Sequence, residues 1–301
     1  MAAVAYAKLD LGQGGELAGQ IGPTLRQQRF GTELRRLREQ AGVGQKEAGA
    51  HIDGDQSKMS RIEKGRTRPK RLEVQALLDL YRVEGDEERA RVLDLWKAGT
   101  SKQYLPEYDL RADMREMVEL EASCTRMEMF ATMHLPGLLQ TDKYAAALIG
   151  GFEPTLEEAD VKHYVDLRMD RQKILEREDP PQVVCILDEG VVHRPIGGPE
   201  VMAQQLAHLL ELAKRPSVTI QVVPFDQAVY DGLHGAFRTL VNDDASALDV
   251  VEISTRTKTL YMQDGADVEA YRKHFDAIRS AALSSRQSAQ LITQAMRNHK
   301  E

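Results

Sequence analysis

A short segment of this chain concentrates positive charge. From Asp55 to Arg71 the sequence reads DQSKMSRIEKGRTRPKR, with seven basic residues and two acids, although the whole chain has a formal net charge of -7. Lysine and arginine side chains neutralise phosphates, while amides, hydroxyls and guanidinium groups can read base edges. The chemistry that these residue types offer together is the binding of a polyanion, and nucleic acid is the polyanion that they fit.

Helical spacing divides the same segment into two faces. At about 100° per residue from Gln56 to Lys64, Met59 and Ile62 fall on one side. The opposite side carries polar residues, which are Gln56, Ser57, Ser60, Arg61 and Lys64. The apolar face is fit to pack against a core, and the polar face is fit to meet base edges and phosphates. The alternative is that these charges form only a solvated helix face.

A second group of chemically capable residues lies in LDEGVVHRP, where Asp188, Glu189 and His193 are close in sequence. Two carboxylates and an imidazole can perform acid-base or metal chemistry. However, the chain has no nucleophile elbow, no histidine pair at metal-ligand spacing and no phosphate-cradling glycine loop. We therefore expect no catalytic residue, no metal and no cofactor. An enzyme with a DNA-binding tether is kept as an alternative.

A third group interrupts the apolar stripe of a helix that we expect to begin near Thr155. Arg168 and Gln172 share a face with apolar residues of that helix. In one interpretation, the stem of Arg168 packs and its head reaches toward solvent, or Arg168 pairs with Asp188 or Glu189. In the other, Arg168, Gln172, Asp188 and Glu189 line a pocket for a ligand or a partner.

Length and charge distribution indicate two domains. The chain has 301 residues, of which 42% are hydrophobic, so it can build real cores. Residues 1–82 carry 15 basic and 10 acidic residues, a net of +5, and the remainder carries 25 and 37, a net of -12. Such asymmetry indicates a polyanion-binding module joined to a module of another kind.

Cysteine usage and hydropathy favour a cytoplasmic protein. Cys124 and Cys185 have no partners at metal-ligand spacing, and we interpret both as buried free thiols of a reducing compartment. No apolar run approaches the length of a membrane span, and the first residues lack the apolar core of a signal peptide. We expect no membrane association.

The elements that must position these groups fall into two parts. We expect a flexible arm at residues 1–23, an all-α domain of five helices at 24–98, a linker at 99–112 and a larger α+β domain at 113–301. In the first domain Asp55 should cap a helix that Gly65 ends. In the second, a Thr155-x-x-Glu158 capping box should open a long helix. The strands expected there are QVVCIL, SVTIQVVP, GAFRTLV, ALDVVEI and TLYM.

A short helix, a turn containing Gly54 and a second helix make a helix-turn-helix, whose second helix docks in the major groove. The segment GVGQKEAGAHIDGDQSKMSRIEKG resembles the Xre/Cro-type motif of phage repressors. The resemblance implies that Gln45 binds phosphate, that Gln56 reads bases, and that Glu63 pairs with an arginine of the first helix, here Arg38. Asp53 and Gly54 stand where that family usually has Gly-Val, so one apolar anchor of the turn is absent.

These considerations give a set of expected DNA contacts. We expect Gln56, Ser57 and Arg61 to read bases. We expect phosphate contacts from Gln45, Lys46, Lys58, Lys64, Arg66, Arg68 and Lys70.

Six motifs occur in order between residues 113 and 297, and they are LPGLLQTDKYA, RMDRQ, LDEGVVHRPIGGPEVMAQQLAHLLELA, VTIQVVPF, GAF and VVEI. On these motifs the segment resembles the domain of unknown function numbered 5753, which follows an Xre-type motif in WhiJ-like actinobacterial regulators. This resemblance implies a transcriptional regulator that binds a double-stranded operator, with a C-terminal domain for dimerisation, partner binding or effector sensing. A homodimer is expected because one helix-turn-helix covers only a half-site.

The resemblance also leaves a second function open. Genes of such regulators often neighbour a gene for a small partner protein of another uncharacterised family, numbered 397. The chain would then be an antitoxin-like interaction protein that binds this small partner and autoregulates its own operon.

Overall fold

The structure is a computed structural model that describes residues 23, 25–98, 105, 108, 110, 112–242, 249–255 and 259–300. The arm expected at 1–23 and the linker expected at 99–112 lie almost wholly outside these residues. The chain divides into two compact units, one with the N-terminal helices and one with the sheet. Helix α7 (Ala112–Ser123) follows the N-terminal helices along the chain and precedes the first strand of the sheet.

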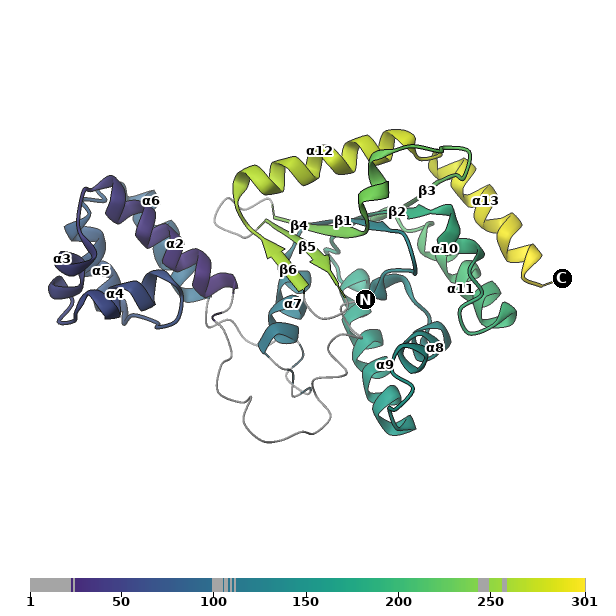
Figure 1. The fold of residues 1–301 in the computed structure, drawn as a ribbon, viewed down its shortest axis with the longest axis horizontal. Coiled ribbons are helices and arrows are strands. Elements are labelled where there is room, and N and C mark those ends of the chain that lie inside the picture. The colour runs from purple at the N-terminus through teal and green to yellow at the C-terminus, as the bar shows by residue number, and fades with distance from the viewer. Residues whose placement is uncertain are drawn as a thin grey trace. The chain divides into compact units, whose positions relative to one another are not determined.

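Five helices form residues 25–98 of the first unit, which confirms the all-α domain (Figure 1). They are α2 (Leu25–Gln40), α3 (Gln45–His51), α4 (Gln56–Glu63), α5 (Arg71–Leu80) and α6 (Asp86–Ala98). Leu34, Met59, Ile62 and Leu77 are completely buried in their shared core. A Cβ atom on Gly31 would lie 2.4 Å from the carbonyl oxygen of Glu63, so α2 and α4 approach closely there because Gly31 has no side chain.

A six-stranded mixed sheet forms the centre of the second unit, in the order β3-β2-β1-β4-β5-β6. The strands are β1 (Arg126–Ala131), β2 (Gln182–Asp188), β3 (Val218–Val223), β4 (Phe237–Val241), β5 (Val250–Ser254) and β6 (Thr259–Met262). β1, β2 and β3 are parallel, and β4, β5 and β6 continue the sheet in antiparallel pairs. The α+β class expected for this domain is confirmed.

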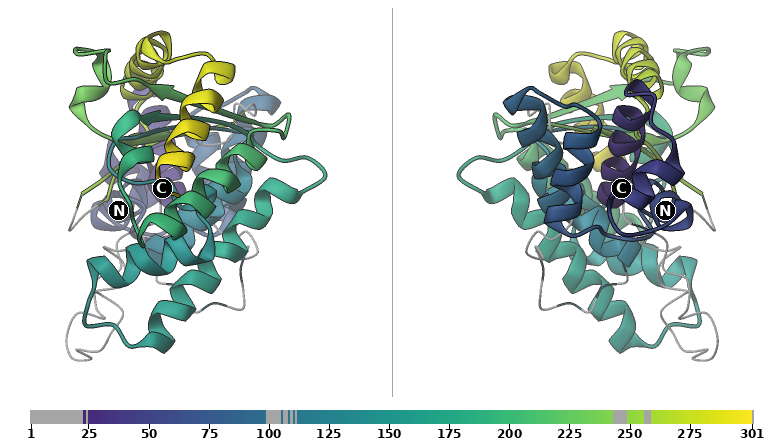
Figure 2. Two further views of the ribbon diagram at one scale, coloured as in Figure 1. Left: turned by 90° about the vertical axis from the view of Figure 1, so that its right-hand side faces the viewer. Right: turned by 90° about the vertical axis from the view of Figure 1, so that its left-hand side faces the viewer.

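Helices cover both faces of this sheet (Figures 1 and 2). The helices that follow α7 are α8 (Asp142–Phe152), α9 (Glu158–Gln172), α10 (Glu189–His193), α11 (Pro199–Leu212), α12 (Gly265–Ala281) and α13 (Ser285–Asn298), with short 3₁₀ turns η1 (Gly137–Leu139), η2 (Lys173–Glu176) and η3 (Asp231–His234). On one face, Phe275 and Ile278 of α12 pack against Phe130, Ile186 and Phe237. α8, α9 and α11 lie on the other side of the sheet.

Several local expectations need correction. The capping box at Thr155 is wrong: the segment from Glu153 forms a turn, closed by the Leu156 N–H donating to the Glu153 carbonyl, and α9 begins only at Glu158. The sequence patterns did not indicate helices α7, α10 and α13. Cys124 and Cys185 are buried free thiols, as expected. Within the described residues no helix is both long enough and apolar enough to cross a membrane.

Candidate nucleic-acid interface

The turn between α3 and α4 sets where the candidate recognition helix begins. The carboxylate of Asp55 accepts a 2.7 Å hydrogen bond from the Lys58 N–H, which caps α4 at Gln56. A Cβ atom on Gly49 would lie 2.3 Å from the Asp55 carbonyl oxygen, so α3 and the turn meet backbone to backbone. Asp53 adopts a positive φ of 50°, an uncommon conformation that Asp tolerates better than most residues.

Helix α4 has the two faces that its sequence predicts. Met59 and Ile62 are completely buried, whereas Gln56, Ser57 and Arg61 are exposed. Arg61 Nη1 makes a long 3.4 Å hydrogen bond to Ser57 Oγ, and Gln56 has no side-chain hydrogen bond to any described residue. The three expected base-reading side chains therefore lie at the start and along one face of α4, open to a ligand.

A buried polar network anchors the other side of α4. Arg38 on α2 donates from Nε to Glu63 Oε1 at 2.5 Å and from Nη2 to Oε2 at 3.3 Å. Only 9% and 3% of the two side chains are exposed, and the hydrogen bond that Arg38 donates to Glu63 raises the pKa of Arg38 despite its burial. Gln45 Nε2 also donates to Glu63 Oε2 at 2.7 Å, so one of its two amide N–H groups is engaged inside the domain.

The seven expected phosphate contacts do not form one equivalent set. Lys46, Lys64, Arg66 and Lys70 are exposed, and their side chains make no hydrogen bond to a described residue. Their cations are available to the phosphate groups of a nucleic acid. Gln45 retains one free N–H group. Lys58 and Arg68 are held by other parts of the domain.

Lys58 is tied to two neighbouring elements. Its Nζ donates to the Ile52 carbonyl at 3.0 Å and to Glu73 Oε1 on α5 at 2.7 Å. The second oxygen of Glu73 accepts from the Lys70 N–H at 2.7 Å. Burial alone raises the pKa of Glu73, but the bonds from Lys58 and Lys70 outweigh it and lower that pKa.

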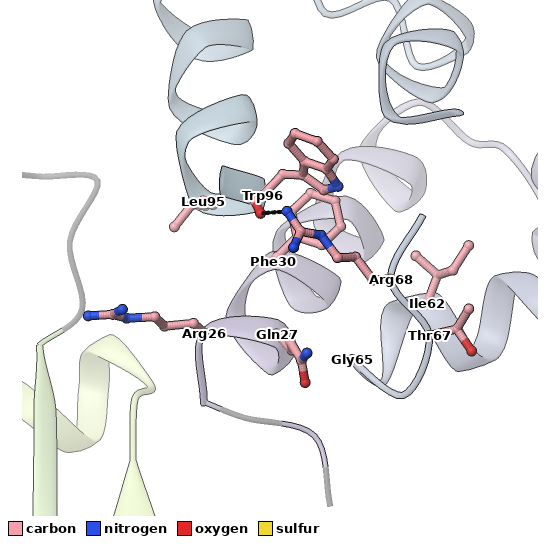
Figure 3. A pocket seen from close by; sticks show the side chains of 9 residues that line it. All are labelled: Arg26, Gln27, Phe30, Ile62, Gly65, Thr67, Arg68, Leu95 and Trp96. Atoms are coloured by element: carbon pink, nitrogen blue, oxygen red, sulfur yellow. Dashed lines mark hydrogen bonds between the residues drawn. The ribbon is translucent and has the colours of Figure 1, made fainter. Parts of the chain in front are cut away.

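Arg68 lies against the end of α6 (Figure 3). Its guanidinium carbon is 4.5 Å from the ring centroid of Trp96, and Nη2 donates to the Trp96 carbonyl at 2.9 Å. Trp96 in turn donates from Nε1 to the Pro69 carbonyl at 2.9 Å. Arg68 and Trp96 also line a small pocket beside Phe30 and Leu95. These contacts fix the basic loop after α4 onto α6.

The polar face of α9 in the second unit is arranged in the opposite way. Arg168 is only 4% exposed and donates from Nη1 to Gln140 Oε1 at 2.5 Å. Gln172 Nε2 donates to the carbonyls of Gly137 and Gln140, both at 2.8 Å. Gln205 of α11, which sequence reasoning missed, donates to the Leu139 carbonyl at 2.7 Å. These side chains hold the LPGLLQT turn. The alternative in which Arg168 pairs with Asp188 or Glu189 is wrong, because its head binds Gln140 instead.

Comparisons with known proteins agree with this two-part architecture. A helix-turn-helix domain model matches residues 29–92. The model of a domain of unknown function (DUF5753) matches residues 114–294 and so covers more than half of the chain. The chain belongs to the DUF5753 family. Among curated proteins no significant match was found. A comparison with solved structures found none either.

Within the DUF5753 domain, the Asp188, Glu189 and His193 cluster holds the connection between β3 and β4. Asp188 caps α10 and accepts 2.7 Å from the Tyr230 hydroxyl. Glu189 Oε2 accepts 2.7 Å from the Phe225 N–H, and its Oε1 lies 3.1 Å from His193 Nε2. Asp188 and Glu189 therefore bind a different segment from Arg168 and Gln172, and no contact among the described residues joins the four into one pocket.

A buried charge network in the DUF5753 domain has no counterpart in the expectations. Glu121 of α7, 1% exposed, accepts from Arg171 of α9 at 2.9 and 2.6 Å and also pairs with Arg238 of β4. Arg238 pairs in addition with Glu252 of β5. Burial alone would raise the pKa of Glu121, but the two arginines lower it to about 2. The four residues are far apart in sequence, so no local pattern could have revealed them.

Proposed function

We propose that this chain is a sequence-specific DNA-binding transcriptional regulator. The observation that carries the proposal is the open polar face of α4, on which Gln56, Ser57 and Arg61 are exposed while Met59 and Ile62 anchor the helix in the core. In a helix-turn-helix the N-terminal end of the second helix meets base edges in the major groove. A glutamine can make a bidentate contact to adenine, and an arginine can do so to guanine.

The phosphate contacts are assigned to side chains whose donor groups are not bound within the domain. Lys46, Lys64, Arg66 and Lys70 are exposed cations, which we assign to phosphates together with the free amide N–H of Gln45. Phosphate contacts position a protein on DNA but carry no sequence information directly. We assign no reaction to Asp188, Glu189 and His193, because both carboxylates are engaged in holding the backbone or side chains of the DUF5753 domain.

The regulator is proposed to act as a homodimer, because one such helix reads only a half-site. The DUF5753 domain would supply dimerisation, effector sensing or partner binding, and the resemblance to WhiJ-like regulators supports a role in developmental or secondary-metabolism control. Sedimentation of the full chain, free and bound to its selected duplex, tests the dimer. A single chain on each selected duplex contradicts it.

Selection from a library of random duplexes tests the DNA-binding function. We expect the full-length protein to enrich one motif with two related half-sites, and to bind it far more tightly than an unrelated duplex of the same length. The logarithm of the binding constant should fall steeply as the logarithm of the salt concentration rises, a dependence that we call the salt slope. Lys214→Ala, an exposed lysine of the DUF5753 domain, is the matched control and should change neither result. No enriched motif, together with a salt slope near zero, would remove the proposal.

A second candidate function is favoured by a specific observation. The connection between β3 and β4 exposes Phe225, Val229 and Leu233, with 63%, 80% and 64% of their surfaces accessible. Large apolar side chains gathered on one segment are typical of protein interaction sites. The hydrogen bonds that Tyr230 and Phe225 donate to Asp188 and Glu189 hold this segment in place. We infer an antitoxin-like role in which this loop binds a small partner protein encoded by a neighbouring gene.

Co-expression with the product of the neighbouring gene tests this role. Wild-type protein should form a complex of defined stoichiometry. The double variant Phe225→Ser, Leu233→Ser should lose it, and a variant of another exposed apolar residue, Leu72→Ser on α5, should keep it. Equal binding by all three proteins would assign the complex to another surface.

A further inference from the structure

The turn of the helix-turn-helix lacks an apolar anchor of its own. Between Ile52, which is buried, and α4 it contains only Asp53, Gly54 and Asp55. Neither an aspartate nor a glycine supplies a side chain that could bury itself beneath the turn. Another group must therefore fix the angle at which α4 leaves α3.

The side chain of Lys58 occupies the missing position. A Cβ atom built on Gly54 would lie 2.4 Å from Lys58 Cδ and 3.3 Å from its Cβ, so the lysine stem lies over the glycine. Helical side chains lean toward the N-terminus of their helix, which brings this stem back over the turn. The ammonium group then binds the Ile52 carbonyl at the end of α3 and Glu73 on α5. A side chain on Gly54 would displace this stem.

We propose that Lys58 is a positioning residue that, through the Ile52 carbonyl and Glu73, fixes the turn and thereby the presentation of Gln56, Ser57 and Arg61 to DNA. The bridge joins three consecutive helices, α3, α4 and α5. It replaces the phosphate contact that sequence reasoning assigned to Lys58. This inference rests on the proposed DNA-binding function and names a residue that sets its specificity.

Electrostatics separates the two roles of Lys58. If its ammonium group moved to a phosphate, Glu73 would lose its cation and would stand as a carboxylate near a polyanion, which is unfavourable. In the bridge, the lysine satisfies the carboxylate and the carbonyl together. The lowered pKa of Glu73 agrees with such a bridge, since burial opposes that shift while Lys58 and Lys70 produce it.

Removing the carboxylate therefore gives opposite results under the two roles. Glu73→Gln removes a negative charge, so if Lys58 contacted phosphate, this variant would bind every duplex more tightly. If Lys58 positions α4, Glu73→Gln should reduce the preference for the selected duplex over an unrelated one by about tenfold, the equivalent of one charge-assisted hydrogen bond. Lys58→Met, which keeps the apolar stem, should change the preference in the same direction and leave the salt slope unchanged. Lys64→Met is the matched control and should lower the slope with the preference intact.

Two further measurements on the full chain complete the test. The double variant Lys58→Glu, Glu73→Lys restores the pair in reverse and should recover part of the preference. The amide of Gly54, which donates to the Gly49 carbonyl at 2.9 Å, should exchange faster with solvent in Lys58→Met and Glu73→Gln than in Lys64→Met. If Lys58→Met fails to fold, as judged by Trp96 fluorescence, Glu73→Gln carries the test.

The outcomes are distinguishable. Tighter binding of all duplexes by Glu73→Gln, with a smaller salt slope for Lys58→Met, overturns the positioning role and restores the phosphate contact. Unchanged Gly54 exchange in both variants also overturns it. If wild-type protein selects no duplex, the DNA-binding function fails, while the exchange measurement still decides whether the bridge fixes the turn.

Discussion

Helices α4 and α9 both carry arginine and glutamine side chains, but these side chains are exposed on α4 and hydrogen-bonded within the domain on α9. On α4, Gln56 and Arg61 are exposed, and nothing in the described part of the domain binds the amide of Gln56. On α9, Arg168 and Gln172 donate to the LPGLLQT turn, and Arg171 to Glu121 of α7. The same residue types therefore indicate a binding surface only where the fold leaves their donors and acceptors unoccupied.

The same difference between α4 and α9 predicts whether a substitution changes the free energy of unfolding or the recognition of DNA. Polar groups that stay in water can be removed with little change in the free energy of unfolding, because no partner is left unsatisfied. Removing one member of a buried pair leaves the other without compensation, which destabilises the fold strongly. Substitutions on the exposed face of α4 should thus change DNA recognition, and substitutions around α9 should change stability.

The largest effect should come from Glu121, the partner of α9. Glu121→Gln leaves Arg171 without a carboxylate and removes one of two from Arg238, so we expect the free energy of unfolding of the DUF5753 domain to fall by about 3–5 kcal/mol. Calorimetry of the full chain measures this loss. Trp96, the only tryptophan in the sequence, lies in the helix-turn-helix domain, and its fluorescence transition should not move. A loss below about 1 kcal/mol would show that the network is of the weak, solvated kind.

A similar but smaller effect is expected from Glu63 on the buried side of α4. Glu63→Gln keeps the size of the side chain but removes the buried carboxylate that Arg38 pairs with, at a cost of about 3 kcal/mol. Urea unfolding followed by Trp96 fluorescence measures it in the right domain. Glu39→Gln is the control, because Glu39 is exposed and solvent screens its ion pairs, so its unfolding midpoint should move little. Equal midpoints for the two variants contradict the prediction.

Acid should destabilise the DUF5753 domain through the protonation of Glu121. Glu121 has a pKa of about 2 in the folded chain against an ordinary value of 4.5. Because folding lowers the pKa, its contribution is complete above pH 4.5 and is lost as pH falls toward 2. The loss is about 3 kcal/mol of unfolding free energy in the DUF5753 domain. Glu121→Gln should flatten this part of the pH profile, and a profile that keeps its slope in the variant would assign the acid sensitivity to other carboxylates.

How much of the fold can be predicted from the sequence depends on how far apart interacting residues lie along the chain. Helix α4 is predictable because its signals are local: Asp55 at the cap, Met59 and Ile62 at helical spacing, and Gly65, with a φ of 70°, after its end. In the sequence, Lys58 and Arg68 look like the other cations of the basic segment, and the pattern therefore predicts that they contact phosphates. Their partners, Glu73 and Trp96, lie 15 and 28 positions further along the chain and are not visible in a local pattern. An unpaired cation and a paired one look alike until tertiary contacts are known.

The C-terminal domain shows the same limit. Strands such as β2 and β3 are recognisable from apolar runs, and the interruption of the α9 stripe by Arg168 is visible in the sequence. Its partner is not, since Gln140 is 28 residues away and offers an uncharged amide where a carboxylate was expected. Burial, with a smaller contribution from the charge of Arg171, lowers the pKa of Arg168 to about 9, and its Nε has no hydrogen-bond partner among the described residues.

Two glutamines, one on α4 and one on α9, should respond differently to the same substitution. Gln56→Ala on α4 should relax preference at one base pair of each half-site, by about 1–3 kcal/mol of discrimination, with unchanged stability and salt slope. Gln172→Ala on α9 removes two hydrogen bonds to the LPGLLQT turn and should destabilise the DUF5753 domain with base preference intact. Competition against a library of sites and thermal unfolding measure both variants. If Gln56→Ala weakens binding to all sequences alike, α4 is docked in another way.

The smallest difference concerns two arginines of the basic loop after α4. Arg66 is exposed with no side-chain hydrogen bond to a described residue, whereas Arg68 is stacked on Trp96 and bonded to its carbonyl. Arg66→Ala should weaken binding to all duplexes and reduce the salt slope by about 0.9 for each phosphate that the arginine no longer neutralises. It should leave Trp96 fluorescence unchanged.

Arg68→Ala should instead alter Trp96 fluorescence, because the cation leaves the indole ring, and should change the salt slope by less than Arg66→Ala does. Arg68→Lys separates charge from geometry: it keeps a cation in the loop but loses the planar group that stacks on the ring while donating to the Trp96 carbonyl. If Arg68 serves the loop, Arg68→Lys should resemble Arg68→Ala in fluorescence. If Arg68→Ala reduces the slope as much as Arg66→Ala does, and Arg68→Lys restores it, then Arg68 leaves Trp96 for a phosphate when DNA binds.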